Sequence, residues 1–110
     1  MNREFKIIRT WKGWTTLENA SLYEELLVNE VFPTVKKNGV NGLEKVIIST
    51  RNQQDEVEFL LTLQFDSIDS VRSFAGENYE QAYIPENAKQ FLKRYNMTAE
   101  HYELKGELIL

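Results

Sequence analysis

The stretch Glu56-Val-Glu-Phe-Leu-Leu-Thr-Leu-Gln-Phe-Asp66 decides the fold. Every second residue from Val57 onward is apolar, which predicts a β-strand with one face fully covered. The alternate row mixes polar and apolar residues: Glu58, Leu60, Thr62 and Gln64. It predicts a second face that is covered but keeps some contact with water. Helices of a chain this short can cover only one face of a sheet. The other face then needs a partner, most simply a second copy of the chain, with a lined cavity between.

Length and composition exclude several classes of protein. A chain of 110 residues is expected to form one domain, residues 1–110. Its net charge is −4 and no basic stripe is present, so no nucleic-acid partner is expected. Without cysteine the chain has no disulfide, thiol nucleophile or thiolate metal site. No apolar run approaches the roughly 20 residues of a membrane span, and residues 1–6 lack a signal-peptide core, so the cytoplasm is expected.

The rest of the chain supplies alternating strands and helices. A first helix is expected from a cap at Thr15 or Thr16 to a stop at residues 36–39, kinked or split by Pro33. Gly13 is expected to break the strand before it. Further helices are predicted over residues 67–75 and 85–95, with an irregular turn at 77–84 between them. Strands are predicted over residues 4–12, 43–51, 56–66 and 98–105, and the apolar end, 107–110, is expected to dock on a partner subunit.

The order of these elements is β-α-β-β-α-β. That order predicts an α+β fold of the ferredoxin-like kind, an antiparallel sheet with helices on one face. The face without helices is the mixed one of the strand at residues 56–66.

The chain resembles the antibiotic-biosynthesis-monooxygenase-like proteins of the dimeric α+β barrel superfamily. Three stretches carry the resemblance: Arg9-Thr-Trp-Lys-Gly-Trp14 with residues 15–20 after it, Glu56-Val-Glu-Phe59, and Phe65-Asp-Ser67 leading into Val71-Arg-Ser-Phe-Ala-Gly-Glu-Asn-Tyr79. Because the order and lengths of the elements also match, the resemblance extends over nearly the whole chain. The resemblance implies a homodimer whose sheets pack face to face, and a cavity in each subunit between sheet and helices. Characterised members of the family include cofactor-free oxygenases of aromatic polyketides and haem-degrading enzymes, and many other members have no known activity.

The chain departs from both branches of this family. The haem-degrading branch uses an asparagine on the first strand and a histidine on the second helical segment. Here the first strand offers Arg9 and Thr10, and the only histidine is His101, on the last predicted strand. The polyketide branch uses an Asn, Trp, Tyr and Arg set, of which this chain has Trp, Tyr and Arg candidates.

Arg9 and His101 are the charged or titratable candidates for catalysis. Arg9 interrupts an apolar row, so it is expected to be buried and to need a partner. That partner is either a carboxylate, such as Glu58 or Glu103, or an anionic or phenolate oxygen of a ligand. His101 has a suitable pKa for a general base, although a satisfied strand histidine is the alternative. No metal motif is present, and neither a metal nor a cofactor is expected.

Aromatic residues supply the candidate ligand contacts. Trp11 and Trp14 suit a flat apolar ligand, a dimer interface or a core. Tyr79 and Tyr83 are four residues apart, so helical spacing would point both hydroxyls the same way, into a mobile cavity wall. Tyr83 is a catalytic candidate that could hydrogen-bond a phenol or quinone oxygen, and the alternative is that both tyrosines are amphipathic surface residues. Phe74 is assigned to the helix core and retained as a candidate ligand contact.

Three functions remain open. The first is a small cofactor-independent monooxygenase that acts on an apolar or aromatic small molecule, with Arg9 or a tyrosine stabilising the substrate oxyanion. The second is a non-catalytic dimer that binds a small ligand, haem included. The third is a structural dimer whose cavity is filled by its own side chains.

Overall fold

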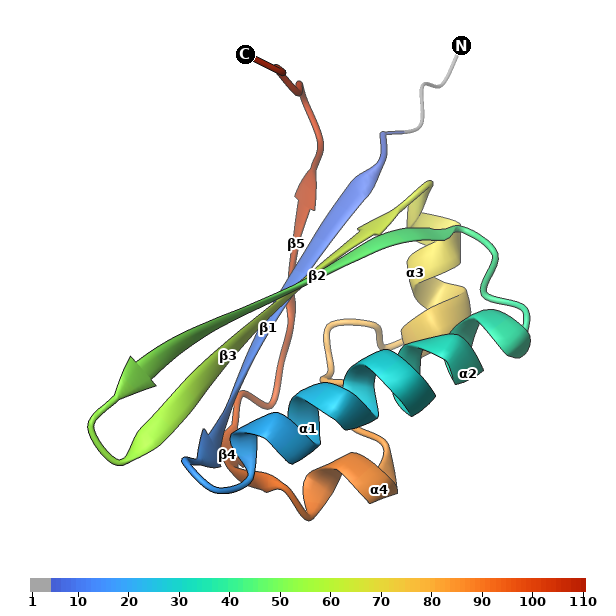
Figure 1. The fold of residues 1–110 in the computed structure, drawn as a ribbon. Helices are drawn as coiled ribbons and strands as arrows, with labels where there is room; N and C mark the ends of the chain where they lie inside the picture. Colours follow the sequence, from blue (N-terminus) through green and yellow to red (C-terminus); the bar gives the residue numbers. More distant parts are fainter. Residues whose placement is uncertain (1–4) are drawn as a thin grey trace, which may run out of the picture.

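A computed structural model describes residues 5–110, and it shows a twisted antiparallel sheet with helices on one face (Figure 1). Glu4, the first residue of the first predicted strand, lies outside the described residues. The strands are β1 (Ile7–Thr16), β2 (Leu43–Gln53), β3 (Glu56–Phe65), β4 (Leu92–Tyr95) and β5 (Glu100–Glu103). The helices are α1 (Ala20–Leu26), a π turn η1 (Leu27–Val31), α2 (Phe32–Lys37), α3 (Ile68–Ala75) and α4 (Glu86–Lys89).

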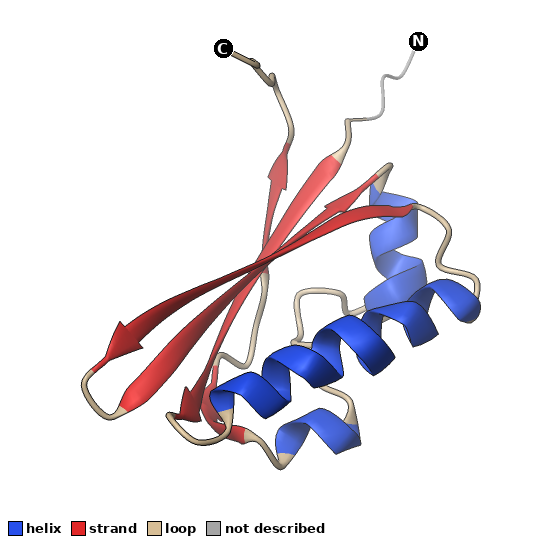
Figure 2. Cartoon of the chain, in the orientation of Figure 1, coloured by secondary structure: helices blue, strands red, loops and turns tan. Residues whose placement is uncertain are grey.

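The sheet order is β2-β3-β1-β4, with β5 also paired to β1. β4 pairs with Gly13–Thr15 and β5 with Ile7–Thr10, so the two short strands share one edge of β1. All pairings are antiparallel, and the helices lie on one side of the strands (Figure 2). The ferredoxin-like α+β arrangement predicted from the order of elements is therefore confirmed.

The third predicted helix, over residues 85–95, is wrong beyond its first turn. α4 ends at Lys89, and Leu92–Tyr95 forms β4 instead. The edge of β1 offers unpaired backbone groups there, and pairing with them outweighs the helical pattern of the local sequence. The last strand is shorter than predicted for the same reason, because β4 and β5 divide that edge between them.

Gly13 does not break the first strand, which continues to Thr16. A Cβ atom at Gly13 would meet the Trp11 ring at 2.6 Å, so the glycine makes room for the indole. The predicted cap is also displaced, because α1 begins at Ala20 with Asn19 as its N-cap. The Thr16 hydroxyl accepts the Asn19 N–H at 3.1 Å and closes the turn that leads into the helix.

The first helix is split, as expected, ahead of Pro33. The split takes the form of the π turn η1, in which the Phe32 N–H donates to the Leu27 carbonyl. Pro33 follows in the first turn of α2, where its missing N–H does least harm.

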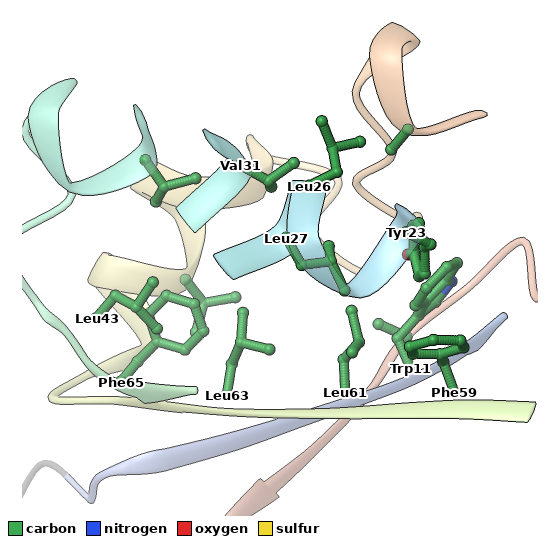
Figure 3. Close-up of a cluster of buried hydrophobic side chains, with 14 of the residues drawn as sticks. Trp11, Tyr23, Leu26, Leu27, Val31, Leu43, Phe59, Leu61, Leu63 and Phe65 are labelled. Carbon is green, nitrogen blue, oxygen red and sulfur yellow. The ribbon is translucent and has the colours of Figure 1, made fainter. Parts of the chain in front are cut away.

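The core forms between the apolar row of β3 and the first helix (Figure 3). Phe59 and Phe65 are fully buried, and Tyr23 meets Phe59 edge-on with ring centroids 4.9 Å apart. The row of β3 that faces away from the helices includes Leu60, which is half-buried. Within residues 5–110 no helix covers that second face, and Ile47 on the neighbouring strand β2 is 47% exposed.

Candidate functional site

A small cavity lies between the sheet and the helices, with a volume of about 30 Å³. Three groups of residues line it. Its floor consists of Arg9 and Trp11 on β1 and Leu61 and Leu63 on β3. Its roof consists of Tyr23, Leu27, Val31 and Phe32. Its side wall consists of Phe74 on α3, Tyr83, Ile84 and Pro85 from the connection to α4, and Ala88.

Strand alternation places Arg9 and Trp11 on the floor. They are two residues apart on β1 and pair with Leu63 and Leu61, whose side chains face the helices. This settles which face of the first strand Arg9 occupies. The Trp11 indole N–H donates to the Asn96 carbonyl at 2.8 Å, so the ring is fixed by the segment between β4 and β5.

The roof residues come from α1, η1 and the start of α2. Tyr23, Leu27 and Val31 follow one another at intervals of four and are all buried. This spacing puts the three side chains on one face of the helix, which contributes both to the core and to the lining of the cavity. Burial raises the pKa of Tyr23, so its phenol is neutral at physiological pH.

Arg9 is a buried cation whose recorded partners are all uncharged. It is 3% exposed, and its Nη1 and Nη2 donate to the carbonyl oxygens of Tyr79 at 2.6 Å and Gln81 at 3.0 Å. Its guanidinium carbon lies 5.3 Å from the centre of the Phe74 ring. Burial lowers the pKa of Arg9 to about 10, which leaves the group charged at neutral pH.

The carboxylates expected as alternative partners of Arg9 are engaged elsewhere. Glu58 points to the other face of the sheet and pairs there with Arg51 at 2.8 Å and Lys12 at 3.3 Å. Glu103 pairs with Lys105 at 3.2 Å. Of the two partners predicted for Arg9, the protein carboxylate is thus not found among the described residues, and the ligand oxygen stays a prediction.

His101 lies beside Arg9 and is neutral at physiological pH. Its Nε2 is 3.0 Å from Arg9 Nη1, and because a guanidinium only donates, Nε2 is the acceptor and the ring proton is on Nδ1. Burial, followed by the charge of Arg9, lowers the pKa of His101 to about 4. Its assignment as a catalytic base stays a prediction, and the base it offers in this arrangement is weak.

The low pKa of His101 predicts a pH-dependent stability. The unfolded chain binds a proton at this residue near its ordinary pKa of 6.5, whereas the folded protein does so only near pH 4. The contribution of neutral His101 to the stability of the fold is therefore fully present above pH 6.5 and is lost as the pH falls toward 4. Urea unfolding midpoints at about pH 7.5 and about pH 5 should differ less in His101→Gln than in the wild type. An equal difference in both would contradict the neutral, buried histidine.

The structure brings together some of the remaining candidates and separates others. Phe74 and Tyr83 meet with ring centroids 4.5 Å apart and both line the cavity, where Tyr83 is 42% exposed. Tyr79 does not line the cavity; its ring lies edge-on to His101 at 5.1 Å, and its carbonyl is bound by Arg9. Because the segment is not helical, Tyr79 and Tyr83 do not point the same way.

Trp14 is not brought to the cavity. It pairs with Glu58 on β3, whose side chain lies on the face of the sheet without helices. There the Arg94 guanidinium carbon lies 3.9 Å from the centre of the indole. Trp14 is therefore separated from Trp11 by the sheet, although the two are close in sequence.

Within residues 5–110, no helix has the length and apolarity that crossing a membrane requires. No group of three or more His, Asp or Glu side chains in this part of the chain gathers in a way that could hold a metal ion.

Comparison with known proteins supports the fold. No family model matches the sequence, and no curated protein matches it. Among solved structures, the chain is similar to the crystal structure described as a "putative antibiotic biosynthesis monooxygenase" from Bacillus cereus, with a TM-score of 0.64. The likeness covers 96% of this chain and 99% of that one at 8% sequence identity. The chain thus has the antibiotic-biosynthesis-monooxygenase-like fold that the sequence resemblance implied, and the likeness extends to the fold alone.

Proposed function

We propose that the protein is a small oxygenase, working without a cofactor, that holds an apolar or aromatic molecule between its sheet and its helices. The observation that carries this proposal is the floor of the cavity, where the buried cation of Arg9 and the indole of Trp11 lie side by side in apolar surroundings. The structural neighbour is itself described as a "putative antibiotic biosynthesis monooxygenase", which supports the same class of reaction.

The proposed chemistry needs an electron-rich substrate anion, which itself reduces dioxygen. A methylene flanked by two aromatic rings and activated by an ionised enol is an example. Oxidation to a ketone transfers one oxygen atom of O₂ to carbon and releases the other as water, so no external reductant is consumed. Arg9 stabilises the oxyanion, and the water-poor cavity strengthens that interaction.

The other cavity residues orient the substrate. Trp11 and Phe74 hold its ring by stacking, and the Tyr83 hydroxyl donates to an oxygen at its far edge. His101 acts through Arg9, because its lone pair accepts from the guanidinium and fixes the position of that group. Since a void of about 30 Å³ holds only about one water molecule, the wall at residues 83–85 must move to admit a substrate.

We also propose that the protein is a homodimer. The face of the sheet without helices carries half-buried Ile8 and Leu60 beside exposed Ile47 and Tyr102. Ile8 pairs with Tyr102, whereas Ile47 pairs with Thr62, which lies two residues from Leu60 on β3. Apolar side chains interspersed with polar ones suit contact with a second copy of the same face.

Anthrone, a tricyclic ketone with an activated methylene, tests the reaction. The protein should accelerate its conversion to anthraquinone, consuming one O₂ per molecule, as followed by absorbance and an oxygen electrode. Trp11→Ala should reduce the rate by at least about 10-fold, since orientation of the ring is lost. Trp14→Phe, on the other face of the sheet, is the matched control and should retain the rate. Failure to accelerate oxidation of anthrone would contradict the oxygenase proposal.

A second candidate is a binding protein for small apolar molecules that performs no reaction. Arg9 and Tyr23, which line the cavity, both hold their protons at neutral pH, and the lone pair of His101 is occupied. Ligand binding without oxygen consumption would favour this candidate. Haem is one ligand to test, and a Soret shift that His101→Ala abolishes would assign it.

A further inference from the structure

We propose that the ligand of this cavity is a monoanion, and that its charged group displaces the main-chain carbonyls of Tyr79 and Gln81 from Arg9. Binding of the ligand and opening of the side wall are then one event. This inference rests on the proposed ligand site and specifies both its ligand class and its gate.

The recorded protein partners of Arg9 do not neutralise its positive charge. Its recorded partners are two carbonyl oxygens and the lone pair of neutral His101, and none of them carries a negative charge. A buried guanidinium with only neutral partners retains most of the penalty of leaving water. Hydrogen bonds to an anion are roughly twice as strong as bonds to neutral acceptors. A carboxylate or phenolate in the cavity is therefore a better partner than either carbonyl.

The side wall of the cavity is attached to the floor through Arg9. The carbonyls that Arg9 binds belong to the connection between α3 and α4, residues 76–85, and the same connection supplies Tyr83, Ile84 and Pro85 to the cavity. Arg9 thus ties the wall to the floor. On its other side the connection is held by Ala82 N–H to the Met97 carbonyl at 2.9 Å and by Ala99 N–H to the Glu80 carbonyl at 2.8 Å.

The cavity is smaller than the ligands proposed for it. A cavity of about 30 Å³ is too small for an aromatic ring, so some part of its boundary must yield. β1 and β3 are fixed by a continuous ladder from Ile7–Phe65 to Thr16–Glu56. The connection has no such ladder, and two of its ties are the bonds to Arg9. An anion with two oxygens can replace both in the fork geometry that a guanidinium prefers.

Binding of 2-naphthoate and of its neutral analogue 2-naphthamide tests the charge. In the Trp14→Phe protein Trp11 is the only tryptophan, and its fluorescence reports on the cavity floor. Naphthoate should bind at least about 10-fold more tightly than naphthamide. Arg9→Gln should remove that preference. Arg72→Gln should keep it, because Arg72 lies over the Tyr79 ring but does not line the cavity.

Hydrogen exchange tests the gate. Saturation with naphthoate should accelerate exchange of the Ala82 and Ala99 amides, while amides of the β1–β3 ladder stay protected. Arg9→Lys, which keeps the charge but cannot reach both carbonyls as a fork, should show the faster exchange without ligand. If either variant fails to fold, the two-ligand comparison in the Trp14→Phe protein still decides the charge.

The outcomes separate the inference from the function on which it rests. Equal affinity for the two probes, with a Trp11 response to both, would overturn the monoanion and leave the site in place. No Trp11 response to either probe would overturn the site together with the inference. Tighter binding of naphthoate with unchanged or slower exchange at Ala82 and Ala99 would overturn the gate.

Discussion

Replacing Leu60 by glutamate should convert the proposed dimer into a monomer. Leu60 lies on the face of β3 that has no helices over it, and its neighbours on that face include Ser49 of β2 and Lys12 of β1. In a face-to-face dimer each new carboxylate would be buried near its copy, which is strongly unfavourable. The dissociation constant should rise by at least about 100-fold, or about 2.7 kcal/mol.

Light scattering at micromolar concentration measures this effect. The wild type should have twice the chain mass of 12.9 kDa, and Leu60→Glu the mass of one chain with an unchanged circular dichroism spectrum. Leu22→Glu is the matched control, because Leu22 is exposed on α1 and should leave the dimer intact. A wild type that already scatters as a single chain would contradict the proposed assembly.

Phe59→Ala should destabilise the folded chain by roughly 3–5 kcal/mol. Phe59 is adjacent to Leu60 but points the opposite way, is fully buried, and meets Tyr23 edge-on. Its loss removes one of the contacts between α1 and the sheet, and leaves a void that close-packed neighbours fill only partly.

The measurement is urea unfolding in the Leu60→Glu background, where dimerisation does not contribute. Ile47→Ala in the same background is the control, because Ile47 is 47% exposed in a single chain and its truncation should cost below about 1 kcal/mol. A loss below about 1 kcal/mol for Phe59→Ala would mean that the helix layer does not pack on this row.

The sequence predicts the layers of this fold because alternation in one strand reports directly on burial. Val57, Phe59, Leu61, Leu63 and Phe65 all lie on the helix side and are buried. Local pattern is less informative where tertiary pairing decides. Leu92–Tyr95 reads as a helix and becomes β4, since only the free edge of β1 specifies it. Gly13 reads as a break, and its need for space beneath Trp11 becomes visible only when the strand is built.

In the candidate site, too, local sequence pattern predicts some features and tertiary structure decides the others. Arg9 and Trp11 could be predicted as a pair, because they are two apart on one strand. The sequence cannot show that Arg9 would bind the carbonyls of Tyr79 and Gln81, since main-chain partners carry no side-chain signal. Trp14 looked equivalent to Trp11, and only the sheet register places it on the opposite face.

The claim that ligands bind between the sheet and the helices is tested most directly by methyl NMR. Adjacent leucines of β3 report on opposite faces, because Leu61 and Leu63 line the cavity and Leu60 does not. On titration with 2-naphthoate, the methyl resonances of Leu61 and Leu63 should shift while those of Leu60 remain in place. Shifts at Leu60 without shifts at Leu61 and Leu63 would contradict the account.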